Sequence, residues 1–205
     1  MASGGVDAVI RHIMGRDYGY PDGFYLHFDT ETTGLPAKDG YNDHTHPQTP
    51  HIVTICAILS DKARNEIARM YEIVKPDGYE IPEEATKIHG ISHEQAMRDG
   101  KPLFQVMWQF ERLALDAHQL VAHNHKFDRL MLKASYYRLG VIPRLRHLDT
   151  ICTMIAATPY AKIPKANGHK GWKWPKASEA YQAFFNEELT GAHGAVADTE
   201  DRKST

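Results

Sequence analysis

The sequence predicts an α/β domain built on a mixed β-sheet. Three strand-like segments follow one another near the start of the chain, which indicates an antiparallel meander. Helical and strand-like segments then alternate, which indicates parallel strands with helices on the faces of the sheet. A chain of 205 residues is long enough for one well-buried core. We therefore expect one domain over residues 1–205, with five strands, a core at about 24–200, and an outer N-terminal segment at 1–23.

Five segments have the composition of strands. They are short apolar or β-branched runs, each bounded by turn residues. The second is nearly all apolar, which is typical of a central strand that is buried on both faces. In chain order they are FYLHFD (24–29), HIVTICAILSD (51–61), NEIARMYEIVKP (65–76), QLVAHN (119–124) and RLRHLDT (144–150).

The helices follow from apolar side chains spaced three and four residues apart, and from end signals. Ser92, followed by acids, predicts a cap within two short helical pieces at 81–100. Pro102 suits the first turn of a helix that reaches about Ala117, and Asn124 predicts the cap of a helix that stops at Gly140. Shorter helices are expected at 6–14, 151–157 and 178–189, and loops at 36–51 and 162–176.

Charge and cysteine content narrow the function classes. The formal net charge is only -2, so any binding to nucleic acid or to an anionic membrane has to be local. Cys56 and Cys152 lie in apolar runs, which favours buried, reduced thiols over a disulfide framework. We find no export signal near the start and no unbroken apolar run of membrane-spanning length. We therefore expect a cytoplasmic protein without a membrane partner.

Two acids stand at the end of the first predicted strand. Asp29 and Glu31 are two residues apart, so on a strand they project from the same face. Like charges this close destabilise each other unless a cation lies between them, so the pair predicts a cation site. The alternative is a solvated strand end that leads into the Thr-Thr-Gly turn.

Three further residues have an ordinary interpretation when taken singly. Asp128 lies one turn into the helix that follows QLVAHN, where an acid complements the helix dipole. His193 and Asp198 lie in HGAVADTE, and a histidine in a polar loop is usually solvated.

Taken together and in this order, DTETTGL, HNHKFD and HGAVAD resemble the three motifs of the DEDDh family, the DnaQ-like or epsilon-type 3'-5' exonucleases. ATKIHGIS (85–92) resembles a further segment of that family, and the resemblance extends from about Phe24 to Asp198. It implies the ribonuclease-H-like fold, a mixed five-stranded sheet flanked by helices.

The resemblance implies a metal-dependent hydrolase that removes nucleoside 5'-monophosphates from nucleic-acid 3' ends, with single-stranded DNA favoured over RNA. It implies that Asp29, Glu31, Asp128 and Asp198 bind two divalent ions, Mg²⁺ or Mn²⁺, and that His193 is the general base. Carboxylates suit such hard cations, and an imidazole titrates near neutral pH.

The resemblance also implies that the turn made of Thr32, Thr33, Gly34 and Leu35 holds the 3'-terminal nucleotide, with Leu35 against a base. We expect His89, Asn124 and Phe127 near the substrate groove. The separate run from Tyr160 to Lys176 holds five lysines, two tryptophans and no acid. We interpret it as a nucleic-acid clamp that uses Lys170, Trp172 and Lys173. The alternative is that the tryptophans pack this loop onto the core.

Two other functions remain open. One is an accessory module that binds a nucleic-acid end or a polymerase with weak or no catalysis, although a pure binding module gains nothing from a costly acidic cluster. The other is an oligoribonuclease or small-nucleotide hydrolase, against which the basic loop argues. The favoured function suits DNA repair or proofreading, alone or with a polymerase or another protein partner.

Overall fold

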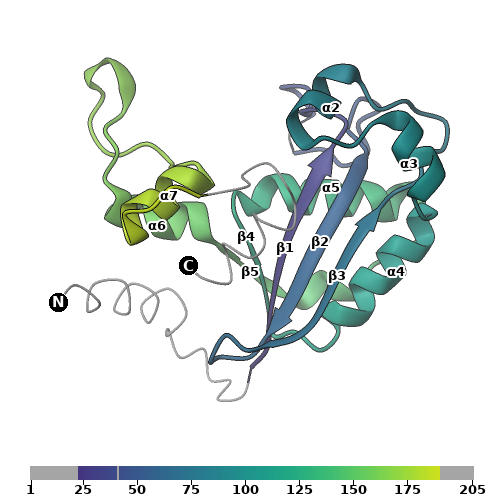
Figure 1. The fold of residues 1–205 in the computed structure, drawn as a ribbon, viewed down its shortest axis with the longest axis horizontal. Coiled ribbons are helices and arrows are strands. Elements are labelled where there is room, and N and C mark those ends of the chain that lie inside the picture. The colour runs from purple at the N-terminus through teal and green to yellow at the C-terminus, as the bar shows by residue number, and fades with distance from the viewer. Residues whose placement is uncertain (1–22, 41, 190–205) are drawn as a thin grey trace.

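The described chain forms a mixed five-stranded sheet with helices packed around it (Figure 1). The structure is a computed structural model, and it describes residues 23–40 and 42–189. The strands are β1 (Tyr25–Thr32), β2 (Ile52–Ser60), β3 (Glu66–Ile73), β4 (Gln119–Ala122) and β5 (Asp149–Cys152). Their order is β3-β2-β1-β4-β5. The predicted five-stranded α/β sheet is therefore confirmed, whereas the helix expected at 6–14 lies outside the described residues.

The strand directions divide the sheet at β1. The first three strands form the expected antiparallel meander, whereas β4 runs parallel to β1 and β5 runs parallel to β4. The middle strand of the five is β1. The strand β2 lies inside the sheet between β3 and β1, and all nine of its residues are buried, as the apolar run had predicted.

The helices lie close to the predicted ranges. They are α2 (Glu83–His89), α3 (His93–Asp99), α4 (Leu103–Ala114), α5 (His125–Arg138), α6 (Thr153–Ala161) and α7 (Ala177–Phe185), with 3-10 turns η1 (Arg144–His147) and η2 (Ala166–Gly168). Ser92 caps α3 as predicted, since its Oγ accepts a hydrogen bond from the N–H of Gln95 at 3.1 Å.

Two predictions about element ends are wrong. Asn124 precedes α5 but makes no side-chain capping bond, because its backbone has a left-handed φ of 62°. Asparagine tolerates that conformation, which turns the chain sharply from β4 into α5. The predicted strand RLRHLDT begins instead with η1, and pairing with β4 starts only at Asp149.

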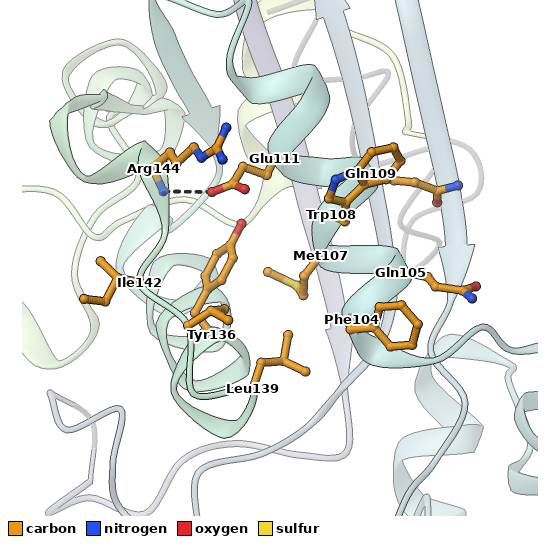
Figure 2. Close-up of a pocket in the computed structure, with 11 residues that line it drawn as sticks. Phe104, Gln105, Met107, Trp108, Gln109, Glu111, Tyr136, Leu139, Ile142 and Arg144 are labelled. Atoms are coloured by element: carbon orange, nitrogen blue, oxygen red, sulfur yellow. Dashed lines mark hydrogen bonds between the residues drawn. The ribbon is translucent and has the colours of Figure 1, made fainter.

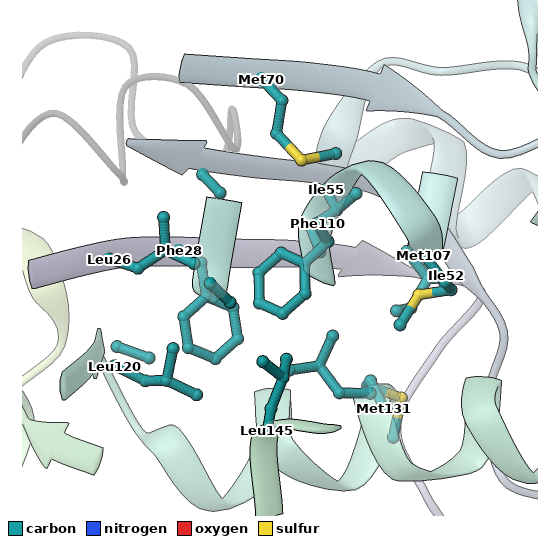
Figure 3. Close-up of a cluster of buried hydrophobic side chains, with 14 of the residues drawn as sticks. Leu26, Phe28, Ile52, Ile55, Met70, Met107, Phe110, Leu120, Met131 and Leu145 are labelled. Carbon is teal, nitrogen blue, oxygen red and sulfur yellow. The ribbon is translucent and has the colours of Figure 1, made fainter. Parts of the chain in front are cut away.

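The main core lies between the sheet and the helices α4 and α5 (Figure 3). Phe28 of β1 meets Phe110 of α4 with ring centroids 5.4 Å apart. Two large apolar residues of α4, Phe104 and Trp108, lie outside this core, because they are 59% and 62% exposed. The buried residues of α4 are instead Val106, Met107, Phe110 and Ala114.

Both cysteines agree with the sequence-based expectation, since Cys56 and Cys152 are buried and neither forms a disulfide. In the part of the chain that the structure describes, none of the helices is long and apolar enough to span a bilayer.

Two phenylalanines of α4 provide a matched test of the core. Phe110 is fully buried, whereas Phe104 on the same helix is 59% exposed. We expect Phe110→Ala to lower the free energy of unfolding by about 3–5 kcal/mol, and Phe104→Ala by less than about 1 kcal/mol. Urea unfolding of both variants measures this difference, and equal losses would contradict the assigned core face.

Candidate functional site

The end of β1 extends beyond its parallel neighbour. The strand β4 pairs with β1 only at Tyr25, Leu26 and His27. The rest of β1 extends past this pairing. The helix α5 begins at His125, shortly after the end of β4. The carboxyl ends of strands, next to helix starts, are where ligand sites form in α/β sheets. The predicted acids Asp29 and Glu31 lie in this segment of β1.

Asp128, in the first turn of α5, reaches across to this segment. Its Oδ1 accepts a hydrogen bond from the Thr30 hydroxyl at 2.8 Å and one from the Thr30 backbone N–H at 3.2 Å. Asp128 is almost fully buried. The structure thus places the Asp128 carboxylate against the peptide group that joins Asp29 to Thr30, as the motif order had suggested.

The two acids of β1 lie on the other face of the strand from this contact. Leu26 and Phe28 belong to the core beneath α4 and α5, so alternation places Asp29 and Glu31 on the opposite face. On that face Asp29 pairs across the sheet with Cys56. Burial raises the pKa of Tyr71 on β3, and the nearby Cys56 and Glu31 raise it further. Tyr71 therefore keeps its proton beside Glu31.

These carboxylates are the right kind of donor for a hard divalent cation, since every side chain of the predicted metal set is an acid. Within residues 23–40 and 42–189, however, no three His, Cys, Asp or Glu side chains lie close enough to share one ion. The predicted residues His193 and Asp198 lie outside the described residues. The described carboxylates therefore fit such an ion by their chemistry, and their role as ligands stays a prediction.

The turn after β1 is fixed by short hydrogen bonds. The Thr32 hydroxyl donates to the carbonyl oxygen of Gly34 at 2.7 Å. Thr33 is bonded twice to His51, because its N–H donates to the His51 carbonyl at 2.9 Å and its Oγ1 accepts from the His51 N–H at 3.0 Å. Leu35 is 81% exposed. The turn is therefore held in place while it presents one apolar side chain to solvent.

A cluster behind this turn was not predicted. The His51 ring stacks on Tyr79, with centroids 3.8 Å apart and an interplanar angle of 16°. Arg138, the last residue of α5, donates hydrogen bonds to the carbonyl oxygens of Thr49 and Pro50. Burial, together with the Arg138 charge, lowers the pKa of His51 to about 4. No local sequence pattern marks these residues, because the contacts join segments far apart in the chain.

The other residues predicted near the substrate are placed as follows. His89 accepts a hydrogen bond at Nδ1 from the Ile91 N–H, and its buried Nε2 has no partner among the described residues. Burial also lowers the pKa of His89. Phe127 packs partly buried against the core, and Asn124 forms the left-handed corner before α5. A role for these three in binding stays a prediction.

The lysine-rich segment between α6 and α7 forms the predicted loop and projects away from the sheet (Figure 1). Trp172 and Trp174 are 44% and 64% exposed, so the alternative in which they pack the loop onto the core is wrong. Lys173 pairs with Glu179 at 2.5 Å. At the end of the loop, His123 Nε2 donates to the Pro175 carbonyl at 2.9 Å, which ties the loop to the end of β4.

A separate apolar groove of about 700 Å³ lies between α4 and the segment that follows α5 (Figure 2). Met107, Trp108, Leu139 and Ile142 are among its lining residues, and no predicted site residue is. The buried hydroxyl of Tyr136 has no hydrogen-bond partner in the described chain. The groove is therefore distinct from the acidic end of β1.

Comparison with known proteins adds a family match. A family model described as an exonuclease, RNase_T, matches residues 26–201. DNA polymerase III PolC-type from Streptococcus sanguinis is 35% identical over 125 residues, which is 61% of this chain and 8% of the polymerase. The corresponding polymerase from Lactococcus lactis is 33% identical over 117 residues, 57% of this chain and 6% of that one. The chain thus matches only a small part of these relatives.

The fold is also that of exonuclease I. E. coli exonuclease I in complex with a dA16 oligonucleotide superposes with a TM-score of 0.68 at 21% identity, over 89% of this chain and 39% of that one. A zinc-bound complex of E. coli exonuclease I with single-stranded DNA gives a TM-score of 0.66 at 22% identity, with 89% and 39% coverage. At these identities the likeness establishes the shared ribonuclease-H-like fold.

The pKa of His51 makes stability depend on pH. Because this pKa is about 4 in the folded chain and 6.5 ordinarily, the unfolded chain binds the proton first as the pH falls. Stability should therefore decrease from about pH 6.5 down to about pH 4. Urea midpoints between pH 7 and 4.5 should fall less for His51→Gln than for the wild type. The exposed His169→Gln serves as the control, and an equal pH slope for His51→Gln and the wild type would count against this assignment.

Proposed function

The chain belongs to the exonuclease family RNase_T, and we propose that it is a metal-dependent 3'-5' exonuclease that releases nucleoside 5'-monophosphates from single-stranded DNA. The observation that carries the proposal is the contact of Asp128 with Thr30, which brings a third acid to the strand end that already bears Asp29 and Glu31. The oligonucleotide complexes of exonuclease I, which shares this fold, support DNA as the substrate.

Asp29, Glu31 and Asp128, together with Asp198, would hold two divalent ions, Mg²⁺ or Mn²⁺. When bound, such ions lower the pKa of the attacking water and stabilise charge on the leaving 3' oxygen. The zinc-bound complex of exonuclease I supports a divalent-ion site in this fold. The buried bonds from Thr30 would fix the direction of the Asp128 carboxylate before any ion arrives.

His193 would act as the general base. An imidazole has an ordinary pKa of about 6.5, so at neutral pH it is largely unprotonated and can accept the proton of the attacking water. The family motif supports this role, since His193 stands five residues before Asp198 in HGAVAD.

The turn at Thr32–Leu35 would bind the 3'-terminal nucleotide. Its exposed Leu35 offers an apolar contact to a base, which is tolerant of sequence. His89 would line this side of the groove; since its Nδ1 accepts a hydrogen bond when the ring is neutral, its proton lies on the buried Nε2. Asn124 and Phe127 at the start of α5 would complete this side of the groove.

A role beside a polymerase is the second proposal. The matched PolC-type relatives are polymerases in which the segment like this chain is 6–8% of the length, which supports a proofreading context. An accessory module without catalysis would keep the binding of 3' ends and lose the cleavage. A preference for RNA or for very short oligomers would point instead to an oligoribonuclease.

Cleavage by the wild type should depend on Asp29. We expect Asp29→Asn to lower kcat by at least about a hundredfold, because one carboxylate ligand is lost while the shape is kept. The assay uses 3'-labelled and 5'-labelled single strands of DNA and RNA with Mg²⁺, Mn²⁺ or EDTA.

Glu84→Gln is the matched control, since it removes one exposed acid from α2 and should leave cleavage unchanged. Cleavage in EDTA, or an Asp29→Asn variant as active as the wild type, would disprove the metal mechanism.

The basic loop should contribute to substrate affinity through its charge. We expect Lys170→Glu to raise KM and to make KM less dependent on salt, because one phosphate contact is lost. Lys170 is exposed, and so is Lys62 in the turn between β2 and β3, at the opposite end of β1 from the site. Lys62→Glu is therefore the control. If the KM of Lys170→Glu equals that of Lys62→Glu, the loop is not part of the binding site.

A further inference from the structure

Arg138 joins the end of α5 to the segment that leads into β2. One terminal nitrogen of its guanidinium donates to the Pro50 carbonyl at 2.9 Å, and the other donates to the Thr49 carbonyl. Thr49 and Pro50 are both buried. A planar guanidinium can bond two carbonyls one residue apart at the same time, whereas a lysine offers a single point charge. The segment before β2 is therefore held by a two-pronged contact.

The Thr49–Pro50 segment is connected through a single residue to the turn at Thr32–Leu35. Pro50 is followed by His51, which makes two hydrogen bonds with Thr33 at 2.9 and 3.0 Å. The His51 ring is stacked on Tyr79, whose hydroxyl donates to the Ile52 carbonyl at 3.4 Å. Each bond in the series from Arg138 to Thr33 thus involves the backbone, so a shift at Pro50 has to move Thr33.

The same helix also holds the acidic end of β1. Asp128 contacts Thr30 at the start of α5, and Arg138 contacts the Thr49–Pro50 segment at its end. Ten residues of helix separate them by about 15 Å. The helix α5 therefore fixes two segments. One is the end of β1, which precedes the turn, and the other is the Thr49–Pro50 segment, which leads to the partner of Thr33.

We propose that Arg138 is a positioning residue, which sets the place of the Thr32–Leu35 turn and thereby the affinity for the 3'-terminal nucleotide. The identity of that ligand rests on the proposed function, whereas the link from Arg138 to Thr33 does not. Arg138 touches no reacting atom in this scheme, so its loss affects binding of the substrate more than the chemical step.

The test compares Arg138→Gln and Arg138→Lys with Lys133→Gln, which removes an exposed cation from the same helix. Hydrogen exchange of the Thr33 amide is measured first, without substrate. We expect it to be about tenfold faster in Arg138→Gln, because charge-assisted bonds are lost, and unchanged in Lys133→Gln. The Thr33 exchange rate in Arg138→Lys should lie nearer to that of Arg138→Gln than to that of the wild type. Lysine keeps the positive charge but cannot bond both carbonyls in the same geometry.

Steady-state kinetics on a single-stranded oligonucleotide follow. We expect Arg138→Gln to raise KM about fivefold or more, with kcat within about twofold of the wild type. Thr33 exchange and KM equal to those of Lys133→Gln, or a lower kcat with unchanged KM, would overturn the inference. A wild type without exonuclease activity would refute the proposed function instead, and Thr33 exchange would then decide the link alone.

Discussion

The site depends on how the backbone hydrogen-bonding groups at the end of β1 find partners. Because β4 pairs with β1 only up to His27, the Thr30 N–H lies beyond the ladder, and it bonds to the Asp128 carboxylate at 3.2 Å. A buried carboxylate requires hydrogen-bond donors, and a charge-assisted bond is stronger than a neutral one. The interaction therefore stabilises the fold and aims a proposed metal ligand with the same pair of bonds. Function and stability are not separable at this position.

Local sequence patterns were sufficient to predict most helices and strands, but not all of the residues at which they begin and end. The apolar run of β2 and the cap at Ser92 are decided by neighbouring residues, and both agree with the structure. Two assignments failed because they depend on tertiary structure. The conformation of Asn124 depends on the turn from β4 into α5, and the start of the strand in RLRHLDT depends on where pairing with β4 begins. Arg138 could not be predicted at all, since its partners are 88 and 89 residues away.

The motif order identified the acids, whereas their geometry came only from the structure. Spacing places Asp29 and Glu31 on one face of a strand, and it does not reveal that Thr30 between them turns to Asp128 on the other face. The exposure of Trp172 and Trp174 was similarly open, because lysine-rich loops with tryptophans occur both packed and free. The net charge of -2 therefore hides a separation of charge, with acids at the strand end and lysines in a loop tied to β4 through His123.

The distance along the chain between Thr30 and Asp128 has a consequence for biosynthesis. These residues are 98 positions apart, so their contact has to wait until the meander, α4, β4 and the start of α5 have all been made. Contacts of such long range form slowly, and translation delivers the N-terminal part first. A ribosome-bound chain that has emerged only as far as β3 would carry Asp29 and Glu31 of β1 but not yet Asp128. In such an intermediate the end of β1 would still lack the bonds from Thr30 to Asp128, so this segment would take its final position only after α5 had begun to form.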